Sequence, residues 1–225
     1  MEPALRRILD DGIEKVLPGI GADEASGISR SLARLYDEIT LFNPAYGLVN
    51  ADGRDLVVRH ILDCLAPAWM MGDATKGMAH VNAADLGSGA GLPGLVLAAV
   101  FPSWNLSLVE RMGRRAGFLR NTVAAMGLSK NVQVVQKDLS EVHDAYNIVT
   151  FRAFRQFKDI ACDLGRIVAP DGRVFAYKSS DGNVEDELKV LEETLPGVFE
   201  SKAVSYEAPF SEARRQMLIL HRRGV

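Results

Sequence analysis

The fold is decided by the stretch Ala84-Asp85-Leu86-Gly87-Ser88-Gly89-Ala90-Gly91-Leu92-Pro93-Gly94. An apolar lead-in ends at an acidic residue, glycines follow at alternate or nearly alternate positions, and an apolar helical run occupies residues 95–101. Glycine takes positive φ without strain and lets a ligand lie directly on the backbone. The pattern predicts a strand, a glycine turn and a helix N-terminus whose free N–H groups face a ligand. The glycines alone leave that ligand open between a dinucleotide and S-adenosylmethionine.

The composition is that of a soluble globular protein with one substantial domain and a small extension. The chain has 225 residues, of which 48% are hydrophobic and 24% charged. No apolar run approaches the roughly 20 residues of a membrane helix, and the N-terminus lacks a signal-peptide core. Cys64 and Cys162 are far apart without metal-ligand spacing, which favours free buried thiols. We therefore expect a cytoplasmic protein without a membrane partner.

The net charge of −3 argues weakly against a nucleic-acid partner, but the basic residues are clustered. Three groups stand out: Arg111, Arg114, Arg115 and Arg120; Arg152, Arg155 and Lys158; and Arg214, Arg215, His221, Arg222 and Arg223. A local basic face binds phosphates whatever the total charge, because salt screens distant carboxylates. Any one cluster taken alone is also typical of a solvated helix or strand face.

The N-terminal part of the chain is predicted to be helical. Apolar spacing indicates helices at residues 1–17, 23–41 and 55–70. A loop is expected at residues 42–47, since Pro44 disfavours helix at the residue before it. All three helices precede the first clear strand, so residues 1–72 are predicted to form an N-terminal helical cap.

Residues 73–225 are predicted to form the second, α/β domain. Strands are expected at 83–86, 105–110, 132–135, 146–151, 173–178, 199–206 and 216–221, with helices at 92–101, 111–126, 154–168 and 184–195. This alternation predicts a Rossmann-like, mostly parallel sheet of seven strands. The last two strands have no helix between them and should form a hairpin, which makes one strand antiparallel.

Ligands on such sheets bind at the carboxyl ends of the strands. Gly87, Glu110, Asp138 and Arg152 each follow or end a predicted strand, so we expect them to converge. Residues 89–94 match the dinucleotide pattern G-x-G-x-x-G, with Glu110 about 20 residues on. Two features favour S-adenosylmethionine instead. Asp85 is placed to attract the cofactor's ammonium group, and a terminal hairpin is expected of methyltransferases. Glu110 would then bind the ribose and Asp138 the adenine amino group.

Five segments in order resemble the GidB/RsmG methyltransferases of bacterial small-subunit ribosomal RNA. Besides the glycine motif, these are Arg59-His60-Ile61-Leu62-Asp63, Arg114-Arg115-Ala116-Gly117-Phe118-Leu119, Arg152-Ala153-Phe154 and Ala176-Tyr177-Lys178. The likeness extends from about residue 30 to the C-terminus. It implies a class I methyltransferase that uses S-adenosylmethionine to methylate guanine N7 in a loop of 16S rRNA near the decoding centre.

The resemblance also implies site residues. By matching position it implies cofactor contacts from Gly87, Leu92, Leu139, Ser140 and Arg152. Asp85, Gly89, Gly91, Glu110 and Asp138 are expected to contact the cofactor because of their places at the glycine turn and the strand ends. Two positions depart from the family pattern: Gly47-Leu48-Val49 replaces Asn-Leu-Thr, and Phe151 stands where a serine is usual. These departures put the contacts of the lost polar groups in question.

Methylation of guanine N7 needs little from the protein beyond alignment and exclusion of water, because N7 has a lone pair and loses no proton. The chain accordingly shows neither a metal-ligand set nor an activated-cysteine motif. Arg152 and Lys178 are the candidate catalytic residues. Arg114, Arg115, Arg214 and Arg215 are candidates for binding RNA. His60 and Asp63 are interpreted as a buried polar pair that holds the helices on the sheet, and Tyr46 and Trp69 as core aromatics.

The sequence leaves two other functions open. One is an NAD(P)-dependent oxidoreductase built on the dinucleotide pattern, and the other is a non-catalytic RNA-binding module that keeps the fold. The expected partner is 16S rRNA or the small ribosomal subunit, and the protein is expected to be a monomer.

Overall fold

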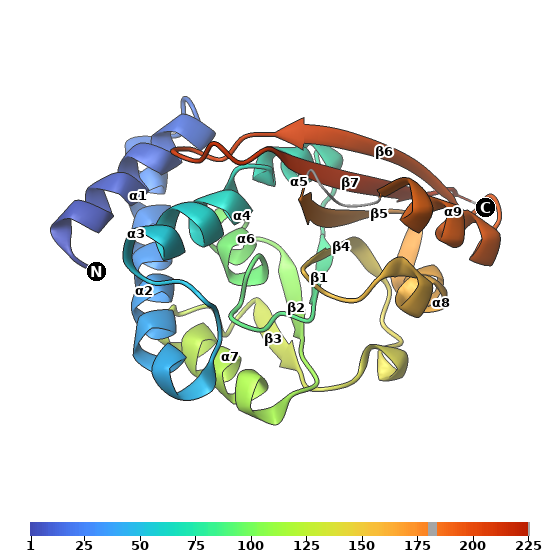
Figure 1. Ribbon diagram of the computed structural model, residues 1–225, viewed down its shortest axis with the longest axis horizontal. Helices are drawn as coiled ribbons and strands as arrows, with labels where there is room; N and C mark the ends of the chain where they lie inside the picture. The colour runs from blue at the N-terminus through green and yellow to red at the C-terminus, as the bar shows by residue number, and fades with distance from the viewer. Residues whose placement is uncertain (180–183, 225) are drawn as a thin grey trace.

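The computed structural model describes residues 1–179 and 184–224. The strands in these residues form one seven-stranded sheet in the order β3-β2-β1-β4-β5-β7-β6 (Figure 1). The strands are β1 (Asn82–Leu86), β2 (Asn105–Val109), β3 (Val132–Val135), β4 (Tyr146–Arg152), β5 (Val168–Ser179), β6 (Phe199–Tyr206) and β7 (Arg215–Arg222). Among them β7 runs antiparallel to both of its neighbours, and the other pairings, β1 to β5, are parallel. The predicted seven-stranded sheet with one antiparallel strand is confirmed.

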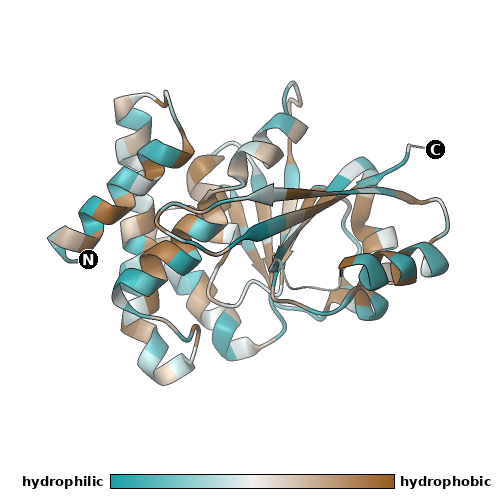
Figure 2. Ribbon diagram, turned by 45° about the horizontal axis from the view of Figure 1, so that its top comes forward, coloured by the Kyte–Doolittle hydropathy of each residue, from teal (hydrophilic) through white to brown (hydrophobic). Residues whose placement is uncertain are grey.

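Helices cover both faces of this sheet. One face carries α1 (Pro3–Val16), α2 (Ala22–Tyr46), α3 (Gly53–Leu56), the π-helical segment η1 (Val57–Leu62), α4 (Asp63–Leu65), α5 (Ala68–Ala74), α6 (Gly94–Val100) and α7 (Gly113–Ala125). The other carries the short 3-10 helix η2 (Leu139–Glu141), α8 (Phe157–Ile167) and α9 (Val184–Thr194). A parallel sheet needs this cover because its strands are apolar on both sides; in Figure 2 the central strands are mostly hydrophobic.

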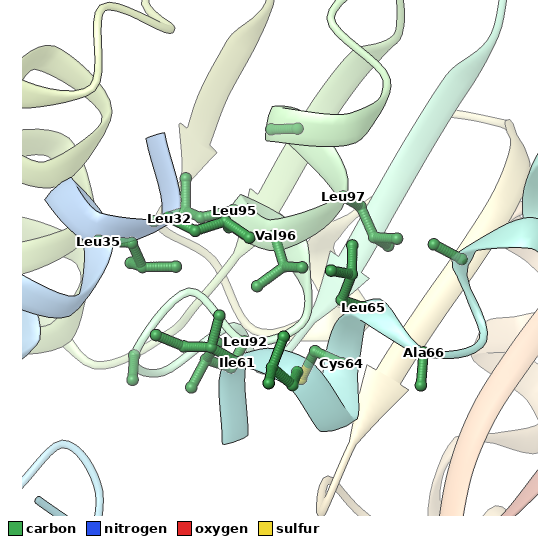
Figure 3. Packing of buried hydrophobic residues seen from close by; sticks show 14 of the residues in the cluster. Leu32, Leu35, Ile61, Cys64, Leu65, Ala66, Leu92, Leu95, Val96 and Leu97 are labelled. Carbon is green, nitrogen blue, oxygen red and sulfur yellow. The ribbon is translucent and has the colours of Figure 1, made fainter. Parts of the chain in front are cut away.

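Strand alternation divides the core into two layers. On β5, Phe175 and Tyr177 face the core shared with the N-terminal helices, whereas Val174 and Ala176 face α8 and α9. Figure 3 shows how Leu32 and Leu35 of α2 approach side chains of η1, α4 and α6 in the first of these cores. The N-terminal helices therefore share their hydrophobic core with the sheet, and a domain boundary at residue 72 stays a prediction.

Three predicted bounds of helices, strands or loops were wrong. The loop expected at residues 42–47 is the last part of α2, which runs to Tyr46 with Pro44 inside it. Pro44 removes one N–H donor near the helix end. The side chain of Asn43 holds the chain that follows the helix, accepting hydrogen bonds from the N–H groups of Leu48 and Val49 at 2.8 and 3.0 Å.

The helix expected at residues 55–70 is interrupted before Ala68 and resumes as α5. Strand β5 starts at Val168 rather than 173, because Val168 pairs with Tyr146 and residues 169–172 bulge out before Arg173 pairs with Ile148. These breaks leave the order of the elements unchanged.

Both cysteines are free thiols, as predicted, but only Cys64 is buried. Cys162 is exposed because it lies off the apolar stripe of α8, which consists of Phe157, Ile160, Ala161, Leu164 and Ile167. In the part of the chain that the structure describes, no helix has both the length and the apolarity to cross a membrane.

Candidate active site

The glycine turn after β1 lies beside the carboxyl end of β2. The N–H groups of Gly87 and Ser88 both donate to the carbonyl of Val109, at 2.8 and 3.1 Å. Gly87 has φ +68°, and a Cβ at this position would overlap the ring of Phe154. A side chain at residue 87 is therefore excluded by backbone conformation and by space at once.

Asp85 lies beneath this turn and is fully buried. Its Oδ2 accepts a hydrogen bond of 3.1 Å from the N–H of Gly94, at the start of α6. Its Oδ1 is buried and has no hydrogen-bond partner. Burial raises the pKa of Asp85 to about 7, because desolvation disfavours the ionised form. A cationic ligand group nearby would favour ionisation and satisfy the unpartnered oxygen.

Glu110, directly after β2, stabilises the turn from the other side. Its two carboxylate oxygens accept hydrogen bonds from the N–H groups of Gly89, at 3.1 Å, and Met112, at 2.8 Å. Each carboxylate oxygen has a second lone pair, so this arrangement leaves acceptor capacity for a ligand.

Asp138, after β3, begins η2. It accepts hydrogen bonds from the N–H and the hydroxyl of Ser140, at 3.2 and 3.1 Å, and from Arg155 at 2.6 Å. The Arg155 contact, with the Ser140 N–H, lowers the pKa of Asp138 to about 2. Asp138 is therefore ionised at neutral pH.

Two neighbouring cavities open at this edge of the sheet. Cavity A, of about 220 Å³, is lined by Gly87, Val109, Glu110, Arg111, Met112, Arg115, Lys137, Asp138, Leu139, Ala153, Phe154 and Arg155. Cavity B, of about 370 Å³, is lined by Asp63, Phe151, Arg152, Ala153, Phe154, Arg155, Gln156, Tyr177, Lys178, Ser179, Glu187, Tyr206 and Arg215. Residues 153–155, which follow β4, line both.

The structure brings together Gly87, Glu110, Asp138 and Leu139 in cavity A, and places Arg152 in cavity B. Other motif residues lie elsewhere. Leu92 packs in the core, as Figure 3 also shows. A Cβ at Gly91 would overlap the side chain of Leu95, so the glycine there permits close packing. Ser140 is exposed, and its N–H donates to Asp138, which caps the start of η2.

Arg152 joins β4 to the N-terminal helical segment. Its guanidinium donates to the carbonyls of Arg59 and His60, at 3.1 and 3.3 Å, and to Sγ of Cys64 at 3.1 Å. It also lies 3.4 Å from the carboxylate of Asp63. Most N–H groups of this side chain are therefore engaged by the protein.

Asp63 has a side chain that is only 4% exposed, and it also accepts a hydrogen bond of 2.9 Å from Nε of Arg215. The predicted role of Asp63 in holding the helices on the sheet agrees with these contacts, although its partners are two arginines rather than His60. Burial and the nearby Arg152 lower the pKa of His60 to about 4, so this imidazole is neutral at pH 7.

Lys178 lies near the end of β5 and also lines cavity B. Its Nζ is 2.5 Å from Oε2 of Glu187 on α9 and 4.9 Å from the centre of the Phe157 ring. The hydroxyl of Tyr206, which also lines the cavity, is buried without a hydrogen-bond partner. Cavity B thus combines aromatic rings with the Lys178–Glu187 pair and with the two arginines that contact Asp63.

The basic residues predicted to bind RNA fall into two kinds. Arg114 and Arg214 are exposed, and Arg114 lies 5.7 Å from the centre of the Tyr46 ring. Arg115 and Arg215 are half-buried; Arg115 lines cavity A and Arg215 lines cavity B.

Trp69 is 51% exposed, so its assignment to the core was wrong. It lies in α5 between Ala68 and Met70, which take the buried positions.

A statistical model of the GidB family, described as "rRNA small subunit methyltransferase G", matches residues 28–218. The chain belongs to this family. It is 28% identical to the "Ribosomal RNA small subunit methyltransferase G" of Treponema denticola, over 96% of this chain and 94% of that protein. It is 30% identical to the protein of the same name from Borrelia hermsii, over 93% of this chain and 98% of that one.

A solved structure supports the fold. The tRNA (m1A58) methyltransferase TrmI from Aquifex aeolicus has a TM-score of 0.54 at 12% identity, over 71% of this chain and 70% of that one. Together with the strand order, this likeness shows the class I methyltransferase fold. Membership of the GidB family does not favour the oxidoreductase that the glycine spacing had left open.

The two departures from the GidB pattern are accommodated locally. The N–H groups of Leu48 and Val49 bond to Asn43, so the loop is held from the end of α2. Phe151 is buried, and its ring packs edge-on against Phe157 at 5.9 Å between centres. An apolar contact occupies the position at which a serine was expected.

Sequence reasoning missed several residues at this site of the GidB family member. Arg155 was noticed only as one of a basic cluster, although it lines both cavities. Neither Glu187 nor Tyr206 belongs to a motif. Glu187 meets Lys178 because α9 packs on the sheet, and Tyr206 lines cavity B with Asp63 because β6 pairs with β7. Asp63 was present in the quoted motif, but its arginine partners lie 89 and 152 residues further on.

Proposed function

We propose that this protein transfers a methyl group from S-adenosylmethionine to N7 of a guanosine in 16S rRNA of the small ribosomal subunit. The observation that carries the proposal is the pair of adjoining cavities at the carboxyl ends of the parallel strands, in a chain that belongs to the GidB family. Cavity A would hold the cofactor and cavity B the target base, with residues 153–155 between them.

Cavity A has the donors and acceptors that S-adenosylmethionine requires. Gly87, Glu110 and Asp138 line the cavity, and Asp85, two residues before Gly87, has a buried oxygen without a hydrogen-bond partner. Asp85 would attract the ammonium group, and Glu110 would accept hydrogen bonds from the ribose hydroxyls. Asp138, Leu139 and Ser140 would surround the adenine, with Asp138 accepting from its amino group on a lone pair that the bond to Arg155 leaves free.

Bound S-adenosylmethionine would supply an electrophilic methyl group on a sulfonium. The guanine N7 lone pair forms the new bond as the sulfur–methyl bond breaks, so positive charge passes to the base and no proton moves. The protein therefore has to align the two reactants and exclude water. Phe154, whose ring packs against the backbone of Gly87, lies on the wall between the reactants. Arg152 supports that wall by holding β4 against η1.

RNA binding is assigned to the basic residues around the two cavities. The exposed Arg114 and Arg214 would contact phosphates, which orient the RNA without specifying sequence. Arg115 and Arg215 reach the cavities themselves, and Arg215 is also bound to Asp63. A set of local phosphate contacts suffices for binding although the whole chain is acidic.

A transfer assay tests the proposal. Small subunits from cells lacking this protein are incubated with it and with S-adenosylmethionine labelled in the methyl group. We expect one label per 16S rRNA, at a guanosine where borohydride and aniline then cleave the strand. An Asp85→Asn variant is expected to bind subunits normally and to transfer slowly. Binding by the unchanged protein with no transfer would instead identify a non-catalytic RNA-binding module.

A further inference from the structure

The ion pair between Lys178 and Glu187 lies on the wall of cavity B rather than on the open surface. The two side chains are 16% and 25% exposed, and their charged atoms are 2.5 Å apart. They come from β5 and α9, and Phe157 supports Lys178 from below. A cation and a carboxylate side by side present hydrogen-bond donors next to acceptors.

The Watson–Crick edge of guanine has the complementary pattern. Its O6 accepts a hydrogen bond, while N1–H and the exocyclic N2 amino group donate. Adenine has a donor where guanine has O6 and an acceptor at N1, so it would oppose the same pair. Proteins that bind unstacked RNA bases commonly recognise this edge.

We propose that Lys178 and Glu187 select guanine as the target base. Lys178 Nζ donates to O6, and the Glu187 carboxylate accepts from N1–H and the N2 amino group. The inference rests on the proposed function, and it adds the residues that determine base identity. Recognition of the Watson–Crick edge leaves N7, on the neighbouring edge of the base, uncovered for methylation.

Other charged groups of cavity B are engaged elsewhere. Among the described residues that line it, carboxylates belong to Asp63 and Glu187, and Asp63 is 4% exposed with two arginine partners. The guanidinium of Arg152 is directed at η1 and α4, and Arg155 is paired with Asp138. Glu187 is therefore the accessible carboxylate for two guanine donors, with Lys178 beside it.

This assignment also gives Glu187 a part in the reaction. The base acquires positive charge when N7 is methylated, which makes N1–H a stronger hydrogen-bond donor. Its bond to the carboxylate therefore strengthens as the methyl group is transferred, and interactions that strengthen in the transition state accelerate a reaction.

The test compares guanosine with inosine, which lacks only the N2 amino group. Small subunits are reconstituted with either nucleoside at the methylated position, and kcat/KM is measured for each. The unchanged protein should prefer guanosine by roughly 10- to 100-fold, as one hydrogen bond to a charged group supplies. Glu187→Gln should lose about that factor on guanosine and most of the preference. Glu193→Gln is the matched control, because Glu193 lies on the same helix in an exposed pair with Lys189.

The affinity for S-adenosylmethionine, measured by calorimetry, should be the same in all three proteins. Equal rates on guanosine and inosine subunits, or a preference that survives in Glu187→Gln, would overturn the inference while leaving the methyl-transfer function in place. Failure of the unchanged protein to methylate either subunit would overturn both. The comparison of guanosine with inosine in the unchanged protein needs no variant. Lys178→Met is a second variant of the same pair, to be used should Glu187→Gln not fold.

Discussion

The carboxylate of Asp63 on α4 accepts a hydrogen bond from Nε of Arg215 at the start of β7, at 2.9 Å and across 152 residues of chain. The same carboxylate is 3.4 Å from Arg152 on β4. One buried acidic group thus neutralises arginines from two strands and joins them to the N-terminal helical segment. The wall of cavity B depends on this contact.

Asp63→Asn should destabilise the protein markedly. The substitution leaves the two arginines, which are 20% and 21% exposed, without their counter-charge. Removing one partner of a buried ion pair costs about 3 kcal/mol. Urea unfolding would measure the loss, with Asp55→Asn as the control because the pair of Asp55 with Arg59 is exposed. A loss as small as that of the control would show that the buried contact is unimportant.

Gly87→Ala should weaken cofactor binding in addition to lowering stability. Gly87 has φ +68°, and a Cβ there would displace Phe154. Gly127→Ala is the matched control, since Gly127 has φ +71° with no atom within 4 Å of an added Cβ. Both should cost about 1 kcal/mol through backbone strain, and Gly87→Ala should cost more because its Cβ would overlap the Phe154 ring. Only Gly87→Ala should weaken S-adenosylmethionine binding by more than tenfold in calorimetry; equal weakening in both would contradict the role of space at residue 87.

The affinity for S-adenosylmethionine should rise with pH. Burial raises the pKa of Asp85 to about 7, so the carboxyl is largely protonated in the folded protein below pH 7. A bound ammonium group favours the ionised form. Between pH 5.5 and 7 the affinity should therefore increase roughly tenfold, with a proton released on binding. Asp85→Asn should remove this dependence, and an unchanged pH profile in that variant would assign it to another group.

The same shift has an opposite consequence for stability without ligand. The folded-state pKa of Asp85 lies above its unfolded value of 3.8. The stability that protonation of Asp85 provides is present at low pH and is lost as pH rises towards 7, because the unfolded chain ionises first. In Asp85→Asn, the free energy of unfolding should not show this decrease between pH 4 and 7, as urea unfolding at several pH values would measure.

Arg114→Ala and Arg214→Ala should weaken RNA binding without changing stability by more than about 0.5 kcal/mol, because both side chains are exposed. Each loss of a phosphate contact should reduce the slope of log affinity against log salt by about 0.7 to 1. Filter binding of small subunits at several salt concentrations would measure this. Lys130→Ala serves as the control, since Lys130 is exposed and precedes β3, at the amino ends of the parallel strands and so away from their carboxyl ends, where the cavities open.

Local pattern sufficed for the sheet and for one wall of the site. Short apolar runs that alternate with helical segments placed the seven strands, and the glycines after β1 located the turn. The convergence of Gly87, Glu110 and Asp138 followed from topology, because parallel strands end at one edge. Proline was the misleading signal: Pro44 lies inside the last part of α2, which ends two residues later at Tyr46.

The sequence by itself determined the class of fold, the family and the edge of the sheet that holds the site, because these depend on residue periodicity and on motifs contiguous in the chain. Only the tertiary structure decided which charges meet. Asp63 with Arg152 and Arg215, and Lys178 with Glu187, are brought together by helix packing and by the reversal of β7. Such pairings depend on distances in space, which the spacing of residues along the chain does not specify.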